Sequence, residues 1–360
     1  MKQRLRLACL DDAGSATDLL RGLGLVLPND AKAHWQRMWI NNPAVQGEGP
    51  HPPLGWVLED GTGRMQGFFA NVPLAYRLGE RRVTVGCGSQ WGIHKECRLH
   101  VTKLAASYFN QPHSDLVLAT TAIKPTGRIF EKYGSLKVPQ ANLNRAAFWI
   151  ADAGGFLRAA LLKKERSPAQ AALLTPALAL VSRFKRRLKG HGLAGCFDLE
   201  AEAGAIDGLW REKLKEPERL MGLRTATALR WHYPKERGAL FIGFRRSGIL
   251  QGFGILLPDH APAIDLRRWR LADLLVLEDD PLVAEAILAE AFRLTQAAQA
   301  HVLEVTGLPD RLWSCVLASG AFLRNLPVWP AYYKTLAPDL DLSRAESWYL
   351  TAYDGDTTLI

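Results

Sequence analysis

The sequence has few of the features that mark secreted, membrane-spanning or disulfide-rich proteins. Its 360 residues include five cysteines, an odd number, and no two of them are spaced as a CxxC pair. That pattern is more typical of a reducing compartment than of a disulfide framework. The longest uncharged apolar stretch, residues 169–181, is shorter than the ~20 residues that a membrane-spanning helix needs. Asp11 and Asp12 interrupt the N-terminus before a signal-peptide core develops, so the sequence predicts a cytoplasmic protein.

The sequence also lacks the short motifs of several enzyme classes. It contains no Gly-rich phosphate-binding loop, no HExxH and no GxSxG. Kinases, zinc enzymes and serine hydrolases therefore have no support, and we expect no bound metal. Asp354 and Asp356, separated by one glycine, suggest a divalent cation only weakly, because two carboxylates without a third ligand are too few.

What the sequence does contain is an ordinary globular composition with one unusual segment. Hydrophobic residues make up 48% of the chain and charged residues 22%, and the length suggests two domains that each bury a core. The net charge is +9, and residues 161–190 carry eight Lys or Arg against one acid, Glu165, which is +7 of that total. The rest of the chain is close to neutral, which argues against a nucleic-acid-binding surface over the whole protein.

The basic segment is also apolar, since it includes the run Ala171-Ala-Leu-Leu-Thr-Pro-Ala-Leu-Ala-Leu-Val181. Two interpretations stay open at this point. The segment could be a solvated helical connector between two domains. It could instead be a peripheral element that lies on an anionic membrane face or touches phosphate groups of a partner. Pro168 and Pro176 would divide it into short helices.

Short sequence words recur in the same order at an almost constant offset. Met65-Gln-Gly-Phe-Phe precedes Leu250-Gln-Gly-Phe-Gly by 185 residues, and Leu116-Val-Leu-Ala-Thr precedes Val302-Leu-Glu-Val-Thr by 186. Gly134 and Gly320, which each close a predicted helix, are also 186 residues apart. Each match is weak alone, but their common order and offset predict two copies of one fold.

Each copy is predicted to contain an antiparallel meander followed by strand–helix–strand–helix–strand. In the first copy we expect strands at 55–59, 65–78, 82–93, 116–121 and 146–151, with helices at 98–109 and 126–133. In the second copy we expect strands at 239–244, 248–257, 270–277, 302–305 and 327–334, with helices at 281–297 and 311–317. Asp60-Gly-Thr-Gly63 is a hairpin signal between the first two strands. This order predicts an α/β protein with a mixed sheet in each copy.

This order of elements, present twice, resembles a tandem GNAT protein, from the superfamily of acyl-CoA-dependent N-acyltransferases. The resemblance rests on Trp91-Gly-Ile-His-Lys-Glu-Cys-Arg98 at the exit of the fourth strand, Leu116–Ala122 on the fifth strand and Ile129-Phe-Glu-Lys-Tyr-Gly134 at the fourth helix. The tail, Trp348–Asp356, is similar to the ending of double-GNAT proteins linked to bacterial surface polysaccharide functions. The resemblance covers about residues 35–356.

The resemblance implies a domain organisation and an activity. We expect a GNAT-like domain at 1–152, a basic amphipathic helical connector at 153–200 and a second GNAT-like domain at 201–360. The implied reaction is transfer of an acyl group from acetyl-CoA or another acyl-CoA to a primary amine, such as an amino sugar or amino acid. A Fem-type transferase, which takes its acyl group from aminoacyl-tRNA and carries a helical arm, is one alternative. A non-catalytic double-GNAT binding or scaffold protein is another.

In GNAT proteins strands four and five separate, which frees main-chain groups for the pantetheine arm of CoA. The following helix directs its free N–H groups at the pyrophosphate, and its start reads Arg/Gln-x-x-Gly-x-Gly/Ala. The matching window here keeps Arg98 but has Val101 and Lys103 in place of the glycines. The second copy has three acids there, Glu278-Asp-Asp280, so we expect CoA only in the first copy. The predicted CoA-binding residues are Ile93, Arg98, His100, Val101, Lys103 and Thr120.

Amine acylation requires a base for the ammonium proton and donors for the thioester carbonyl. The predicted catalytic residues are His94, Glu96, Asp354 and Asp356. The first two follow the fourth strand, where the family often places its base, and the two tail aspartates could bind an amine or sugar hydroxyls. For each of them the alternative is an ordinary polar turn. Phe130 stands where many family members have a tyrosine proposed as the acid for the leaving thiolate, and Tyr133 lies one helical turn further on.

Overall fold

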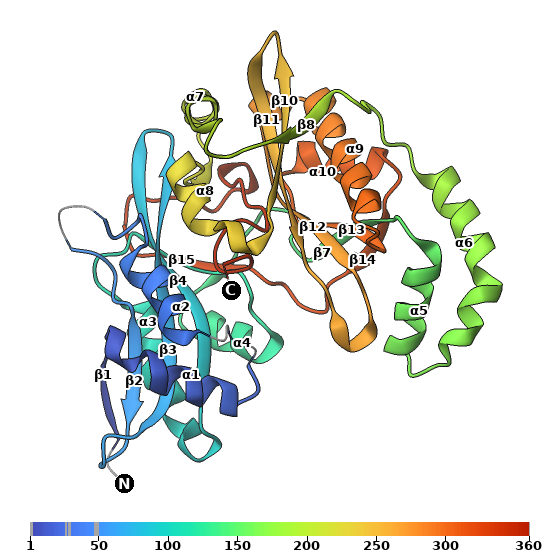
Figure 1. Cartoon of the computed structure of the whole chain (residues 1–360). Coiled ribbons are helices and arrows are strands. Elements are labelled where there is room, and N and C mark those ends of the chain that lie inside the picture. The colour runs from blue at the N-terminus through green and yellow to red at the C-terminus, as the bar shows by residue number, and fades with distance from the viewer. Residues whose placement is uncertain (1–2, 26, 28–29, 47–49, 360) are drawn as a thin grey trace.

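The computed structural model describes residues 3–25, 27, 30–46 and 50–359, which form two mixed β-sheets side by side (Figure 1). The elements of the first half are β1 (Arg4–Leu7), α1 (Ala13–Gly22), α2 (Ala31–Trp35), β2 (Gly55–Glu59), β3 (Met65–Leu78), β4 (Arg81–Ile93), α3 (Val101–Phe109), β5 (Leu116–Ala119), α4 (Lys124–Lys132), β6 (Leu136–Lys137) and β7 (Arg145–Ile150). The helices α5 (Ala153–Lys163) and α6 (Ala171–Lys185) follow. The elements of the second half are β8 (Ala194–Phe197), α7 (Ala203–Lys213), β9 (Leu220–Gly222), α8 (Ala226–His232), β10 (Leu240–Arg246), β11 (Ile249–Pro258), β12 (Arg268–Val276), α9 (Pro281–Ala297), β13 (Val302–Thr306), α10 (Asp310–Ala318), β14 (Phe322–Asn325) and β15 (Tyr332–Thr335).

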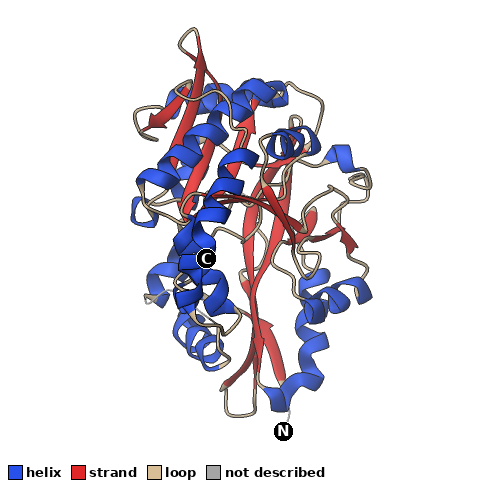
Figure 2. Cartoon of the chain, turned by 90° about the vertical axis from the view of Figure 1, so that its right-hand side faces the viewer, coloured by secondary structure: helices blue, strands red, loops and turns tan. Residues whose placement is uncertain are grey.

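The predicted mixed α/β fold is confirmed. The first sheet has the strand order β1-β2-β3-β4-β5-β15-β6, with β9 paired to β3, and the second has the order β14-β7-β13-β12-β11-β10-β8. Helices flank the strands (Figure 2). The predicted helices and the long strands lie within a few residues of their expected positions.

The turn between β2 and β3 shows how local chemistry sets these elements. Asp60 Oδ1 accepts hydrogen bonds from the backbone N–H groups of Thr62 (2.9 Å) and Arg64 (3.1 Å). Gly63 has φ = +83°, a conformation that glycine adopts without steric cost. In the second half, the carboxylate of Asp280 accepts a hydrogen bond from the N–H of Leu282 (2.9 Å) in the first turn of α9. Local side-chain chemistry of this kind is readable in the sequence, and both elements lie where it predicts.

The two sheets repeat one strand order and exchange one strand. The run β2-β3-β4-β5 corresponds to β10-β11-β12-β13, and in each sheet the next place is taken by a strand from the other half. β7 lies between β13 and β14, and β15 lies between β5 and β6. The strands predicted at 146–151 and 327–334 therefore form, but their assignment to their own copies is wrong. Both are antiparallel to their neighbours, and the exchange ties the halves together.

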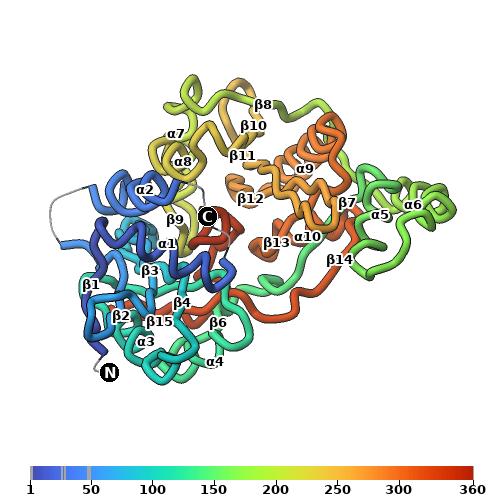
Figure 3. Tube along the Cα trace, turned by 60° about the horizontal axis from the view of Figure 1, so that its bottom comes forward, coloured from blue at the N-terminus to red at the C-terminus, as the bar shows by residue number. Residues whose placement is uncertain are grey.

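The basic segment forms a helical hairpin of α5 packed on α6, which projects from the second sheet away from the first (Figures 1 and 3). The hairpin ends before residue 200, because β8 pairs with β10 through residues 194–197. That pairing repeats the pairing of β1 with β2, so the structural repeat includes β1 in the first half and β8 in the second. The boundaries 1–152, 153–200 and 201–360 therefore describe stretches of sequence, whereas the two sheets share strands.

The first sheet buries apolar side chains on both faces. Trp56 joins the core under α3, whereas its neighbour Val57 joins the core under α1 and α2, because successive residues of a strand point to opposite faces. The tail that follows β15 returns to the junction of the two halves, where the C-terminus lies (Figures 1 and 3). There Trp348 joins a core of the first half and Tyr349 the core of the second. The tail therefore packs into both halves at once.

Candidate active site

The parallel strands β4 and β5 pair along part of their length and then separate. They are neighbours at Val85–Cys87 and Leu116–Leu118, and β4 continues to its end at Ile93 without β5 beside it. Tyr108 of α3 lies at the point of separation, where its hydroxyl accepts from the N–H of Gly88 (2.9 Å) and donates to the carbonyl of Leu118 (2.8 Å). These are the next backbone groups along the two strands. Tyr108 therefore takes the place of the next inter-strand hydrogen bond, and the part of β4 beyond Gly88 has no paired strand on this side.

A bulge in β4 lies beside this open edge. Phe69 of β3 pairs with Trp91 and Ala70 pairs with Ser89, so Gln90 is the extra residue. Gln90 has φ = +39°, a left-handed conformation that costs a residue with a side chain about 1 kcal/mol or more. Because of the bulge, Ser89, Gln90 and Trp91 all contribute to the wall of one cleft, whereas side chains of a regular strand alternate between faces.

The cleft between the separated strands encloses about 360 Å³. Three aromatic rings form one wall: Phe69 stacks on Trp91 with ring centroids 4.6 Å apart, and Trp91 stacks on Phe130 at 6.2 Å. The indole Nε1 of Trp91 is buried and has no hydrogen-bond partner among the described residues. The cleft thus presents an apolar wall, which suits an apolar ligand.

The C-terminal tail places one carboxylate in this cleft. Asp356 accepts hydrogen bonds from the hydroxyls of Thr120 (3.0 Å) and Thr121 (3.1 Å), and a third comes from Ser89. Burial raises the pKa of the Asp356 carboxyl above its ordinary value, and the three hydroxyl hydrogen bonds oppose that rise only in part. A carboxylate with a raised pKa is a stronger proton acceptor near neutral pH. Asp356 therefore has the environment of a general base.

Gly355 allows the tail to approach β5 this closely. It has φ = +70°, and a Cβ atom at this position would overlap the side chain of Thr120. Thr120 Oγ1 donates to the carboxylate of Asp356 (3.0 Å) and accepts from its backbone N–H (3.2 Å). Both the backbone conformation and the close contact require glycine between the two aspartates.

A basic helix start lies just beyond the end of β4. Residues 95–100 form a 3₁₀ turn that leads into α3, with Arg98 and Lys103 exposed and His100 half-buried. The first N–H groups of a helix have no acceptor within the helix, and its dipole favours an anion there. Ile93 is the last residue of β4 and Val101 the first of α3. Five of the six predicted CoA-binding residues therefore lie together at this end, and the sixth, Thr120, holds Asp356.

The four predicted catalytic residues lie in three different places. Glu96 is exposed and paired with Lys95 (3.8 Å), and His94 is half-buried at the start of the 3₁₀ turn. Asp354 is fully buried on the other side of Gly355, where it accepts from Arg224 (2.9 Å). Asp356 is the one of the four among the described residues that line the cleft. Two aspartates that are two residues apart in sequence thus belong to different sites.

In the second half, side chains of the protein bond the free edge of the corresponding strand. β12 pairs with β13 at Arg268–Leu271 and then continues to Val276 without it, which repeats the separation of β4 from β5. Here Tyr349 of the tail donates to the carbonyl of Leu274 (2.7 Å), and Lys213 donates to the carbonyl of Val276 (2.5 Å). Backbone acceptors on the open edge of β12 are therefore already used.

The start of α9 is acidic where the start of α3 is basic. Asp279 is buried between Lys213 (2.9 Å) and Arg219 (2.7 Å), and Asp280 caps the helix. A cavity of about 530 Å³ lies at this end, and its lining has five acids, Glu216, Glu278, Asp279, Asp310 and Glu346, against two cations, Arg219 and Arg311. Carboxylates at this place repel an anionic ligand, which agrees with the charge contrast expected from the sequence.

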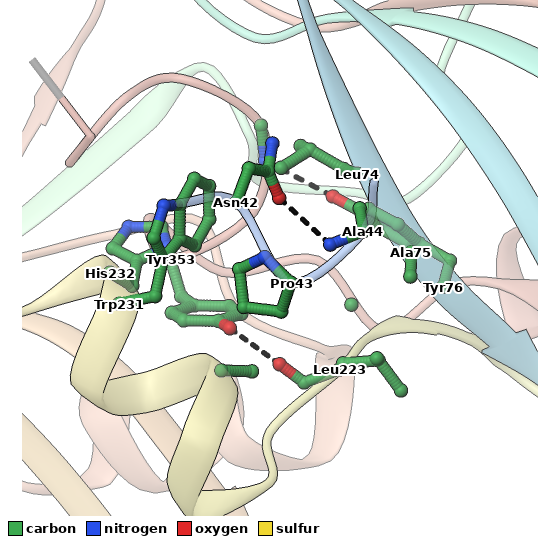
Figure 4. Close-up of a pocket in the computed structure, with 13 residues that line it drawn as sticks. Asn42, Pro43, Ala44, Leu74, Ala75, Tyr76, Leu223, Trp231, His232 and Tyr353 are labelled. Carbon is green, nitrogen blue, oxygen red and sulfur yellow. Dashed lines mark hydrogen bonds between the residues drawn. The ribbon is translucent and has the colours of Figure 1, made fainter. Parts of the chain in front are cut away.

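A smaller cavity marks the junction of the halves (Figure 4). It encloses about 30 Å³ among residues that include Asn42, Tyr76, His232 and Tyr353. Burial lowers the pKa of His232 well below its ordinary value, so this imidazole is neutral, and its Nε2 lies 2.9 Å from the hydroxyl of Thr358. The cavity has room for about one water molecule. It is a packing feature and not a substrate site.

No protein-family profile and no curated protein matches this sequence. Similar solved structures include a conserved protein of unknown function from Enterococcus faecalis V583, with 9% identity and a TM-score of 0.58 over 93% of this chain and 72% of that one. Another is a GCN5-related N-acetyltransferase from Anabaena variabilis, with 11% identity and a TM-score of 0.56 over 93% and 73%. N-myristoyltransferase of Saccharomyces cerevisiae with bound myristoyl-CoA has 12% identity and a TM-score of 0.55 over 93% and 79%. The fold is a tandem pair of GNAT-like domains.

The GNAT fold of each half accounts for the separation of β4 from β5 and of β12 from β13. At these identities the likeness concerns the fold, so the chemistry must be argued from the residues of this chain. Among the described residues, no helix has the length and apolarity needed to cross a bilayer. Within the same residues, no three His, Cys, Asp or Glu side chains are grouped to hold a metal ion.

Sequence reasoning did not identify Tyr108, Ser89 or Thr121 as parts of the site. One usable signal was present in β4, where Gly86 and Gly88 precede Ser89, because glycine inside a strand often marks a bulge or a close approach. Tyr108 has no such signal, since it occupies an ordinary inward position of an amphipathic helix. Its role depends on the two backbone groups that the fold brings to its hydroxyl.

Proposed function

We propose that the protein is an acyl-CoA-dependent N-acyltransferase that works in the cleft of its first GNAT domain. The observation that carries the proposal is the buried carboxylate of Asp356 between the separated strands β4 and β5. A basic helix start, that of α3, lies beyond the end of β4. The second domain has the same strands, but a tail side chain bonds the free edge of β12 and the helix start is acidic. We therefore assign the chemistry to the first domain and a supporting role to the second.

The first domain offers one group for each part of an acyl-CoA. The open edge of β4 beyond Gly88 would pair with the amide groups of the pantetheine arm. The start of α3, with Arg98, His100 and Lys103, would hold the pyrophosphate. Since Val101 and Lys103 replace the glycines that admit phosphate close to the backbone, the charged side chains would supply much of this affinity.

Asp356 would accept one proton from the ammonium group of the acceptor. The neutral amine then attacks the thioester carbonyl, so that a C–N bond forms as the C–S bond breaks, and the second N–H proton leaves with the CoA thiolate. Thr120 and Thr121 hold the carboxylate in place.

We propose a primary amine such as an amino sugar or amino acid as the acceptor. A buried carboxylate ringed by hydroxyls suits an ammonium group with neighbouring hydroxyls. The sequence resemblance of the tail to proteins linked with surface polysaccharides also favours an amino sugar. A panel of amines with acetyl-CoA, followed by release of free thiol, would rank these acceptors.

Titration with acetyl-CoA and longer acyl-CoAs tests the proposal directly. A ligand at 100 times its dissociation constant stabilises the folded state by about 2.7 kcal/mol, which a thermal shift readily shows. We expect binding of an acyl-CoA and amine-dependent release of thiol. Absence of both across the acyl-CoA and amine panels would overturn the proposal.

A further inference from the structure

The outer helix of the hairpin carries its large apolar side chains toward solvent. Leu173 is 83% exposed and Phe184 is 76% exposed, and Leu174, Leu180 and Val181 are also exposed. These five residues recur at intervals of one, six, one and three along α6, which places them on one face of a helix with 3.6 residues per turn. The stripe thus runs along the outward side of α6.

The face of α6 that packs inward carries small residues and one half-buried leucine, Leu178. Ala171 and Ser182 are its buried residues, and Thr175 bonds the carbonyl of Ala171 (2.8 Å). A helix on the surface of a globular protein normally turns its apolar face to the core and its polar face to water. α6 instead turns its largest apolar side chains toward water. A contiguous exposed apolar stripe of this kind marks an interaction surface.

Positive charge surrounds the stripe at both ends. The turn between the helices and the end of α6 carry exposed basic residues: Lys163, Lys164, Arg166, Arg183, Lys185 and Arg187. Glu165 is the single acid in the whole segment 153–190. None of the ion pairs found among the described residues involves these cations, although Lys185 lies over the ring of Phe322 at 4.3 Å. Their charge is therefore available to an external anionic surface.

The hairpin is placed and sized for a surface. α6 lies at the outer edge of the molecule, beyond α5, in two different views (Figures 1 and 3). Its 15 residues extend about 22 Å, which is less than the ~30 Å hydrocarbon core of a bilayer. It can lie along a membrane surface but cannot cross it. Pro176 lies on the exposed side of the helix and does not end it.

We propose that the α5–α6 hairpin docks the protein on an anionic lipid bilayer. α6 lies parallel to the surface with its apolar stripe among the first acyl carbons, and the basic residues at its two ends contact lipid phosphates. An RNA backbone would engage the cations but would leave the five apolar side chains in water. A second copy of the chain would bring a like-charged hairpin against this one, which repulsion disfavours.

Vesicle cosedimentation tests this proposal with the full-length protein. We expect binding to vesicles of phosphatidylcholine with phosphatidylglycerol, weaker binding to phosphatidylcholine alone, and loss of binding as salt rises. Each basic residue near an anionic surface contributes about five-fold to partitioning. The triple change Lys163→Glu, Lys164→Glu and Arg166→Glu should therefore lower binding by about 100-fold or more, and Leu173→Ser with Leu180→Ser and Phe184→Ser should abolish it.

Matched controls keep the test specific to the hairpin. Ile249→Ser removes an apolar side chain that is 66% exposed elsewhere, and Lys32→Glu reverses an exposed charge on α2. Both should bind vesicles as the parent protein does. All variants should keep the parent melting temperature, and Phe184→Ser alone serves if the triple serine variant does not fold. The cleft lies in the first domain, so acyl transfer to a soluble amine should be unchanged.

Three results would overturn the proposal. The first is equal binding to neutral and anionic vesicles, or binding that survives both triple changes. The second is salt-dependent binding of tRNA, lost with the glutamate variants, in a protein that does not bind vesicles. The third is a dimer that the serine variants dissociate, again without vesicle binding. Since these readouts do not depend on acyl transfer, failure here and failure of the proposed activity are distinguishable.

Discussion

The two GNAT-like domains share a strand order and differ in the side chains that meet the separated edges of their central strands. In the first, Tyr108 holds β4 and β5 apart and the space beyond remains a cleft with Asp356 at its side. In the second, Tyr349 and Lys213 bond the free carbonyls of β12. The same backbone geometry is therefore compatible with a binding site or with a packed interface, and the side chains decide which one forms.

The charges at the two helix starts follow the same division. α3 begins among Arg98, His100 and Lys103, whereas α9 begins behind Asp279, which is already paired with two cations. The second domain buries ion pairs that hold the tail, such as that of Arg224 with Asp354 (2.9 Å). That tail, in turn, places Asp356 in the first domain. The second domain thus supports the tail that lines the cleft of the first domain.

Asp356→Asn tests the open cleft most severely. Loss of a general base lowers kcat by about 10²- to 10⁴-fold, and we expect this range with little change in melting temperature. Steady-state thiol release measures it. Asp310→Asn, in the acidic cavity of the second domain, is the matched control and should leave kcat unchanged. Equal losses of kcat in both variants would contradict the assignment of the chemistry to the first domain.

Arg224→Met tests whether the buried ion pairs of the second domain stabilise the fold. Arg224 is fully buried between Asp273 (2.9 Å) and Asp354 (2.9 Å), so its removal leaves two buried carboxylates without a cation. Such a change costs about 3–5 kcal/mol of the free energy of unfolding, measured by urea denaturation. Arg230→Met, which breaks an exposed pair with Glu200, should cost about 0–1 kcal/mol. A small effect at Arg224 would argue against a structural role for this network.

Charge reversal at the two helix starts sharpens the comparison further. Arg98→Glu combined with Lys103→Glu should weaken acyl-CoA binding by several tens-fold, because charge-assisted phosphate bonds are lost. Glu278→Lys, at the start of α9, should leave the calorimetric affinity unchanged. Tighter binding in the Glu278 variant would place the nucleotide in the second domain.

The two tyrosines that meet the open strand edges should differ in their effects. Tyr108→Phe leaves the N–H of Gly88 and the carbonyl of Leu118 unpaired, and Tyr349→Phe leaves the carbonyl of Leu274 unpaired. Each should lower the free energy of unfolding by about 1–3 kcal/mol. Only Tyr108→Phe should also raise the KM for acyl-CoA, by a few-fold. Parallel kinetic effects in both variants would contradict the assignment of the site to one domain.

The pH dependence of kcat/KM is the finest test. Because burial raises the pKa of Asp356, its carboxylate is protonated and inactive below that raised value. We expect kcat/KM to fall as the pH drops through it, by at most ten-fold per pH unit, with the midpoint above the ordinary value of 3.8 for an aspartate. The residual activity of Asp356→Asn should not show this acid-side fall of kcat/KM. A fall that persists in the variant would assign the titration to another group.

Much of the fold was predictable because it depends on local chemistry. The hairpin turn at Asp60, the cap of α9 at Asp280 and the long apolar strands each arise from residues close together in sequence. The repeat and the basic segment are likewise properties of composition and spacing. The charge contrast between the starts of α3 and α9 needed no coordinates either.

The sequence by itself therefore determined the elements, their duplication and the position of the charge. Tertiary structure decided which sheet received β7 and β15, because each strand pairs with partners that are distant in sequence. It also separated Asp354 from Asp356. The tail turns at Gly355, so Asp354 faces Arg224 of the second domain and Asp356 faces Thr120 of the first, and both partners are distant in sequence. The outward direction of the Leu173 and Phe184 stripe was decided in the same way, because the periodicity of α6 marks an apolar face but only packing on α5 shows which side meets water.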